Sequence, residues 1–173
     1  MKYFTSALFA ALYTTVSTTA SAQGADYAKC RFYDNRNYSG NRRPRVDAEL
    51  AIKQDIGSSE VTIDFGFERG HKNTDYTLDF YSTENGSVID ERRCNLVNNP
   101  TKLTTDLITG TTDRSRDFSR VTATTSTFDV MDIEDGLIYA ILSDDTDIVA
   151  CCELEDLSSK RSYDKIIRNL DRI

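Results

Sequence analysis

The feature that most constrains this chain is an alternation of apolar and polar residues with a period of two. It is clearest in residues 61–68 and 76–81, and it recurs in residues 28–33. Successive side chains of a β-strand point to opposite faces, so the pattern predicts strands with one face turned to a core. Further apolar or β-branched segments of strand length lie at residues 46–52, 121–128, 137–142 and 148–154.

Turn-forming residues separate these segments, at 35–41, 57–59, 70–73, 84–86 and 143–146. Residues 95–117 show no clear period, which predicts a long loop with one short strand or turn. About eight short strands with turns between them favour an antiparallel β-sandwich or barrel. The length of 173 residues suits one domain.

Residues 158–173 differ from the rest of the chain, because their apolar residues have helical spacing. Ile166, Ile167 and Leu170 fall on one face of a helix, and Ser158 or Ser159 is suited to cap its N-terminus. We therefore expect a β-domain over residues 23–157, followed by a C-terminal amphipathic helix or tail over residues 158–173.

The N-terminal segment has the features of a secretory signal peptide. Lys2 supplies a positive charge, residues 8–16 are mostly apolar, and Ala20-Ser21-Ala22 has the small–x–small form of a cleavage site. We predict that residues 1–22 are a signal peptide and that the protein is secreted. Removal of this segment leaves 151 residues with 20 basic and 28 acidic side chains, a net charge of −8.

All four cysteines lie after this segment, at Cys30, Cys94, Cys151 and Cys152. An even number of cysteines in an exported chain favours two disulfides. Adjacent residues of a strand point apart, so Cys151 and Cys152 lie on opposite faces and are poorly placed to bond to each other. Cys30 and Cys152 both lie on apolar faces. If the first and last strands are neighbours, these two can bond, which leaves Cys94 for Cys151.

Two N-glycosylation sequons fit secretion, one at Asn37 and one at Asn85. Both lie among turn-forming residues, where a glycan has room.

Several segments resemble the copper/zinc superoxide dismutase family. Residues 144–154 are similar to the family's closing strand, residues 137–143 to the strand before it, and residues 27–32 to its first strand. Thr105-Asp106-Leu107 resembles part of its zinc loop. The resemblance implies an eight-stranded Greek-key β-barrel in which a loop cysteine is bonded to the last strand.

A barrel of this kind places its first and last strands side by side. It therefore favours Cys30–Cys152 together with Cys94–Cys151. A shift of one residue in strand register would exchange the partners and give Cys30–Cys151 with Cys94–Cys152.

The family's metal ligands have no counterpart in this chain. Asp79 and Tyr81 stand where its copper-binding histidines are expected, and Ile148 aligns with its catalytic arginine. His71 is the only histidine, and copper needs several imidazoles to hold and cycle it. We expect a relative with no metal, no cofactor, no catalytic residues and no dismutase activity, and we expect His71 to be a solvated surface side chain.

Charge and hydropathy exclude other classes. The formal charge of −7 disfavours non-specific nucleic-acid binding, and no uncharged apolar run reaches the ~18 residues of a membrane span.

Asp144, Asp145 and Asp147 lack the spacing of a calcium loop and predict a solvated acidic turn. The basic run Arg42-Arg-Pro-Arg45 predicts an exposed loop, with docking to an acidic partner or proteolytic processing as alternatives.

These observations favour a secreted, disulfide-stabilised Greek-key β-sandwich or barrel of about eight short strands with a C-terminal helix. It is expected to act by binding an extracellular protein or surface, as an interaction or effector protein, through loops 34–45 and 95–117. The alternative is a secreted hydrolase with a carboxylate pair that the sequence does not identify. A small-ligand carrier is a third possibility, but its Gly-x-Trp signature is absent because the chain contains no tryptophan.

Overall fold

The computed structural model of the protein describes residues 24–40, 42–82, 93–95, 100–133 and 138–173. The predicted signal peptide and Asn85 lie outside this part of the chain.

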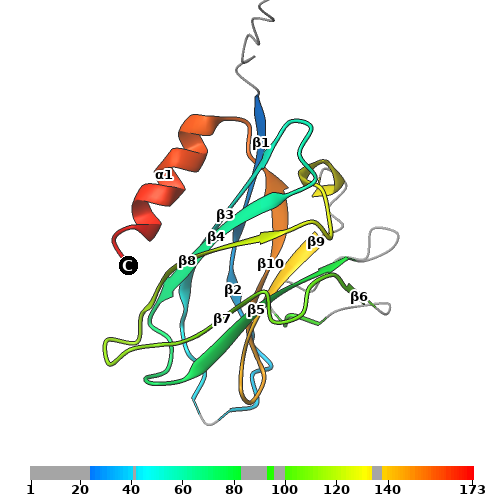
Figure 1. The fold of residues 1–173 in the computed structure, drawn as a ribbon. Coiled ribbons are helices and arrows are strands. Elements are labelled where there is room, and N and C mark those ends of the chain that lie inside the picture. Colours follow the sequence, from blue (N-terminus) through cyan, green and yellow to red (C-terminus); the bar gives the residue numbers. More distant parts are fainter. Residues whose placement is uncertain (1–23, 41, 83–92, 96–99, 134–137) are drawn as a thin grey trace, which may run out of the picture.

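Strands dominate the described residues, and one α-helix follows them (Figure 1). The strands are β1 (Ala25–Arg31), β2 (Tyr33–Asp34), β3 (Asp47–Asp55), β4 (Val61–Glu68), β5 (Asp75–Ser82), β6 (Thr101–Lys102), β7 (Ile108–Thr111), β8 (Phe118–Thr125), β9 (Ile138–Asp144) and β10 (Ile148–Asp156). A short 3-10 helix, η1 (Val130–Ile133), precedes β9, and the α-helix α1 (Lys160–Leu170) follows β10.

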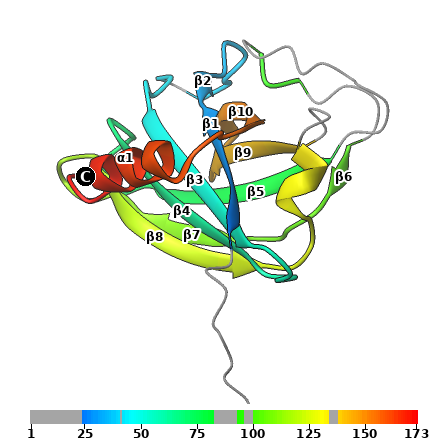
Figure 2. The same cartoon turned by 90° about the horizontal axis from the view of Figure 1, so that it is seen from above.

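Every pairing between these strands is antiparallel, and the sheet curls into a half-barrel (Figure 2). The strand order is β6-β5-β9-β10-β1-β3-β4-β8, with β2 beside β10 and β7 beside β5. The chain crosses between the two ends of this order after β4, after β7 and again after β8, as in a Greek key. The predicted fold class is therefore confirmed, including the C-terminal helix.

The strands follow the sequence pattern, with shifts at several boundaries. β1 begins at Ala25, three residues before the alternation at 28–33, and ends at Arg31, and β3 continues to Asp55, three residues past its expected end. β8 begins at Phe118, three residues before the expected start, and residues 126–128 lie outside it. The segment predicted as a loop with one short strand contains two, β6 and β7, which both pair with β5. Short edge pairings of two to four residues leave no periodic signal in the sequence.

The concave side of the sheet encloses the main core. Phe65, Phe67, Tyr76 and Phe118 are buried there and contact one another through their rings. A second, smaller cluster lies on the opposite face of β9 and β10. Because both of their faces are covered, β9 and β10 are buried over most of their length.

Helix α1 packs on the outside of β1, β3 and β4 (Figures 1 and 2). Ser159 caps its N-terminus by accepting a hydrogen bond from the backbone N–H of Ser162, so the second of the two predicted caps is used. Leu170 is buried against β4 at Gly66, where an added Cβ would lie 3.2 Å from both the Leu170 side chain and the Phe118 carbonyl oxygen. Glycine therefore allows the helix to approach the sheet closely.

A buried carboxylate lies beneath this helix. Asp64 is 2% exposed and accepts hydrogen bonds from Arg120 and Thr122 of β8 and from Tyr163 of α1. Arg120 also pairs with Asp171 at the C-terminal cap of the helix. Burial and the Asp64 charge raise the pKa of Tyr163 well above its ordinary value, so its hydroxyl stays protonated as a donor. This network joins the helix to the sheet.

Candidate functional site

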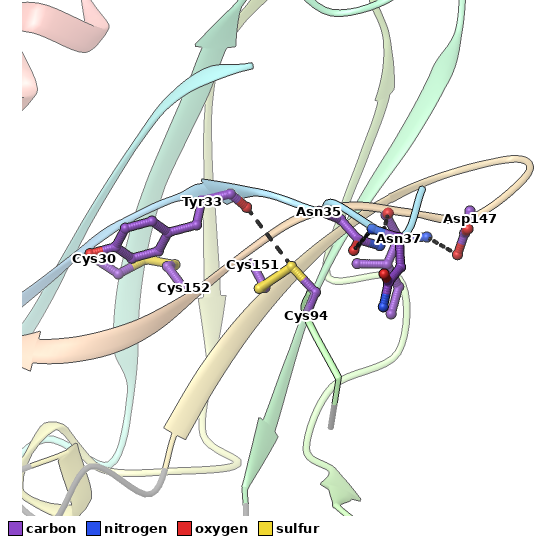
Figure 3. The surroundings of a disulfide bond; sticks show 9 residues. Cys30, Tyr33, Asn35, Asn37, Cys94, Asp147, Cys151 and Cys152 are labelled. Atoms are coloured by element: carbon purple, nitrogen blue, oxygen red, sulfur yellow. Dashed lines mark hydrogen bonds between the residues drawn. A yellow bond between two sulfur atoms is a disulfide. The ribbon is translucent and has the colours of Figure 1, made fainter. Parts of the chain in front are cut away.

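Both disulfides are present, and they attach two different segments to β10 (Figure 3). Cys30 of β1 is bonded to Cys152, with 5.7 Å between their Cα atoms, and Cys94 is bonded to Cys151, at 5.6 Å. This is the pairing favoured by the side-chain faces rather than the exchanged one. Cys30 and Cys152 belong to the main core, whereas Cys94 and Cys151 belong to the second cluster.

Ile148 does not follow the alternation of β10. Strict alternation along residues 148–154 predicts Ile148 on the same face as Cys152, and this prediction is wrong, because Ile148 packs against the second cluster with Cys151. A register irregularity between Ile148 and Ala150 changes the alternation, and Val149 enters the main core in its place. A β-bulge of this kind is not encoded in the apolar pattern.

The loop between β2 and β3 is fastened to the β9–β10 turn. Asn35 donates from its side chain to the carbonyl of Ile148 and from its backbone to that of Val149, both at 2.8 Å. Tyr38 donates to Asp144 at 2.6 Å, and the backbone N–H of Ser39 donates to Asp147 at 2.9 Å. These contacts position the start of the loop that carries the basic run.

Asp144 is therefore not the solvated turn residue that was expected. Its side chain is only 2% exposed. Burial raises the pKa of Asp144, but hydrogen bonds from Tyr38 and Thr146 outweigh it, and the pKa lies below its ordinary value. The carboxylate thus stays charged and holds Tyr38 in place.

Beyond this anchor, three loops form an arginine-lined pocket at the lower end of the barrel in Figure 1. The pocket has a volume of about 540 Å³. Its lining consists of Arg42, Arg43, Pro44 and Arg45 from the β2–β3 loop, Arg69, Gly70 and His71 from the β4–β5 loop, and Arg116 from the β7–β8 loop. We call this group of residues the arginine pocket.

The electrostatics of the arginine pocket oppose those of the chain as a whole. Five arginines line it, although the protein carries a net charge of −7. All five are exposed, and within the part of the chain that the structure describes none of them has an ion-pair partner. Asp34 interacts electrostatically with Arg43 and Arg45, but one carboxylate does not offset five positive charges, and a local excess of positive charge attracts anions. The pocket is therefore a local positive site on an acidic protein.

Two of these arginines have a backbone conformation that L-residues rarely adopt. Arg69 has φ +68° and Arg116 has φ +82°, both in the left-handed region. Gly70 joins their loops by donating to the Arg116 carbonyl at 2.8 Å, and an added Cβ at Gly70 would meet the Phe67 ring at 2.7 Å. Unfavourable backbone conformations of this kind are concentrated at functional sites in proteins.

His71 lies at the edge of the arginine pocket and is not the solvated side chain that was expected. Its side chain is 29% exposed, and its Nδ1 lies 3.8 Å from Asp144, too far for a hydrogen bond. Nε2 is buried, with no hydrogen-bond partner in the described part of the chain. Its backbone N–H donates to Tyr76 and its carbonyl accepts from Thr112, so the position of the residue is fixed.

Burial raises the pKa of the Tyr76 hydroxyl to about 12. Tyr76 therefore remains a neutral phenol at physiological pH and adds no negative charge beside the arginine pocket.

The other predicted site residues lie elsewhere. Asn37 is exposed in the β2–β3 loop, so its sequon is accessible. Asp79 and Tyr81, where the resemblance noted above led us to expect copper ligands, lie near Lys102: its ammonium group is 2.7 Å from the Asp79 carboxylate and 6.0 Å from the centre of the Tyr81 ring. Among the described residues, no cluster of three or more His, Cys, Asp or Glu side chains is arranged to hold a metal ion.

A second cavity, of about 420 Å³, lies between α1 and strands β1 and β3. Its lining mixes both signs of charge, with Lys29, Arg31 and Lys165 beside Asp47 and Glu49. Glu49 accepts a hydrogen bond from Asn169 of the helix. This cavity has no net preference for one class of ligand.

In the described part of the chain, no helix has the length and apolar character needed to cross a membrane.

The arginine pocket as such was not predicted from the sequence, although two of its three loops were named there. Loops 34–45 and 95–117 were predicted as the contact surface, and both contribute arginines to it. The contribution of the β4–β5 loop was missed, because Arg69 and His71 appear in the sequence only as polar residues of a turn. The convergence of the three loops depends on the Greek-key crossovers, which no local motif records.

Comparisons of the chain with protein-family models, with curated proteins and with solved structures find no match in any of the three.

Proposed function

We propose that this chain is a secreted, disulfide-stabilised binding protein that holds an anionic ligand in the arginine pocket. The observation that carries the proposal is the convergence of five exposed arginines from three loops on one pocket of an acidic protein. Guanidinium groups pair with carboxylate, sulfate and phosphate groups through parallel N–H donors. The half-barrel and its disulfides would serve as the rigid support for these loops.

Secretion is supported by two independent features. Residues 1–22 have the charge, apolar centre and small residues of a signal peptide. The two disulfides are typical of proteins that mature in an oxidising compartment.

The proposed kinship with copper/zinc superoxide dismutases draws support from the connectivity. The strands follow a Greek-key order, and Cys94, which lies between β5 and β7, is bonded to the last strand. Because the chain has one histidine, the relationship would be that of a binding protein on a shared barrel and not of a metalloenzyme. A hydrolase with a carboxylate pair draws no support from the arginine pocket, whose described lining contains no acidic residue.

Retention on a sulfonate cation-exchange resin at pH 7.5 tests anion binding without presuming a ligand. We expect the secreted protein to be retained despite its net negative charge. The variant Arg43→Ser/Arg116→Asn should elute markedly earlier, because it removes two pocket charges.

The matched control is Arg161→Ser/Arg168→Ser, which removes two exposed arginines of α1 and leaves the pocket intact. It should elute near the wild type. Equal shifts in the two variants, or no retention of the wild type, would contradict the proposal. N-terminal sequencing of protein from the medium tests secretion, and the mature chain should begin near Gln23.

A further inference from the structure

We propose that the arginine pocket takes the sulfate groups of a sulfated polysaccharide. The inference rests on the proposed function, namely that this pocket binds an anionic ligand, and it specifies the chemical class of that ligand.

The lining residues exclude several other ligand classes. His71 carries the one aromatic side chain in the described lining, which contains no Phe, Tyr or Trp, so neutral sugar rings and nucleic-acid bases lack a broad aromatic surface on which to stack. Pro44 and Gly70 are the lining residues without a polar side chain, so an apolar ligand would find few contacts. Recognition must therefore depend on the charged groups of the ligand.

The exposure of the arginines favours an extended polyanion over a small one. Sites for small ligands bury most of the ligand and enclose it with a few fixed polar groups. Here all five arginines are exposed and come from three loops. Arginines in this arrangement can contact several charges along a chain that extends beyond the pocket. A single small anion would leave most of them unpaired.

The placement of the arginines on three loops around the pocket favours a sulfate ligand over a carboxylate ligand. A carboxylate has two oxygens in one plane and pairs best with one guanidinium group in a bidentate contact. A sulfate ester has three terminal oxygens that point in three directions and accept hydrogen bonds from several sides. Arg43, Arg69 and Arg116 belong to three different loops that surround the pocket. Sulfate therefore matches the distribution of donors better than the side chains of an acidic peptide.

Calorimetric titration of the full mature protein with heparin oligosaccharides tests the proposal. Chemically desulfated heparin of the same length, polyglutamate, inorganic sulfate and single-stranded DNA serve as comparison ligands. We expect heparin to bind at least roughly tenfold more tightly than each of them. If three to five ion pairs form, affinity should fall roughly 50- to 500-fold between 50 and 200 mM salt, by analogy with phosphate contacts to DNA.

The imidazole NMR signals of His71 locate the ligand. His71 lines the arginine pocket and is the only histidine, so its signals are identified without further assignment. Heparin should shift them in the wild type and in Arg161→Ser/Arg168→Ser. In Arg43→Ser/Arg116→Asn the shift should be much weaker. Circular dichroism melting establishes that each variant is folded.

The outcomes separate this proposal from the proposed function. Retention on the sulfonate resin that depends on the pocket arginines, combined with equal affinity for heparin and polyglutamate, would leave anion binding intact and overturn the sulfate assignment. Equal affinity for inorganic sulfate would replace the polymer with a small anion. Heparin binding that leaves the His71 signals unchanged would place the ligand elsewhere.

Discussion

Replacement of Arg120 by methionine should strongly destabilise the protein by leaving Asp64 buried without its cation. Arg120 donates from Nε at 3.0 Å and from Nη2 at 2.8 Å to one Asp64 oxygen. Breaking a buried ion pair from one side costs about 3–5 kcal/mol. Thr122 and Tyr163 still donate to Asp64 in the variant, and the Arg120 side chain is 30% exposed, so water partly replaces it. We therefore expect Arg120→Met to lower the free energy of unfolding by about 3 kcal/mol, at the lower end of that range.

Urea unfolding followed by circular dichroism measures this loss, and a double-mutant cycle assigns it to the pair. Asp64→Asn alone should cost about 1–2 kcal/mol, because it weakens the hydrogen bonds of a buried acceptor. In the double variant Asp64→Asn/Arg120→Met no buried charge is left alone. The measured coupling should therefore be about 2 kcal/mol. A coupling below about 0.5 kcal/mol would refute the view that the two charges stabilise each other, since independent sites add within that margin.

Three further predictions follow from the other contacts. The pKa of Asp144 is lowered in the folded protein, so the stability that its charge contributes is present above its ordinary pKa of about 3.9 and is lost as the pH falls through the lowered value. When unfolding is measured as a function of pH, the Asp144→Asn variant should therefore lose less stability in acid than the wild type. Removal of the Cys94–Cys151 bond, which spans 57 residues, by double serine substitution should lower the free energy of unfolding in urea by about 4 kcal/mol in the chain-entropy model. Arg116→Asn should raise stability by roughly 0.5–1 kcal/mol, because asparagine tolerates a left-handed backbone better than arginine, while it weakens retention on the sulfonate resin.

The parts of the fold that were predictable are those in which the side-chain period alone determines the outcome. Residues 61–68 form β4 with Ile63 and Phe65 buried on one face, as the alternation predicts. The same alternation fails at Ile148, where a bulge changes the face of a residue without changing the apolar pattern. The alternation also fails to predict the burial of Asp64. This residue occupies a polar position of the pattern, but it is buried because α1 covers the outer face of β4.

The candidate site was less predictable than the fold, because it is made of residues that are distant in the sequence. Arg45, Arg69 and Arg116 meet only after two Greek-key crossovers have brought their loops to one end of the barrel. The basic run 42–45 was visible as a charge cluster, but its environment was not. Asp144 looked like one of several turn carboxylates, and only the tertiary contact with Tyr38 distinguishes it.

The adjacent positions of Cys151 and Cys152 also bear on how the protein would fold during the export proposed above. Cys30 is bonded to a partner 122 residues later, so in that case its disulfide cannot form until almost the whole chain has been translocated. Before that, Cys30 and Cys94 are the only thiols exposed to the oxidising machinery. When β10 arrives, a bond to the wrong member of the pair places the correct thiol one residue away. Because thiolates attack nearby disulfides, the neighbouring cysteine can correct the error by local exchange, without unfolding of the barrel.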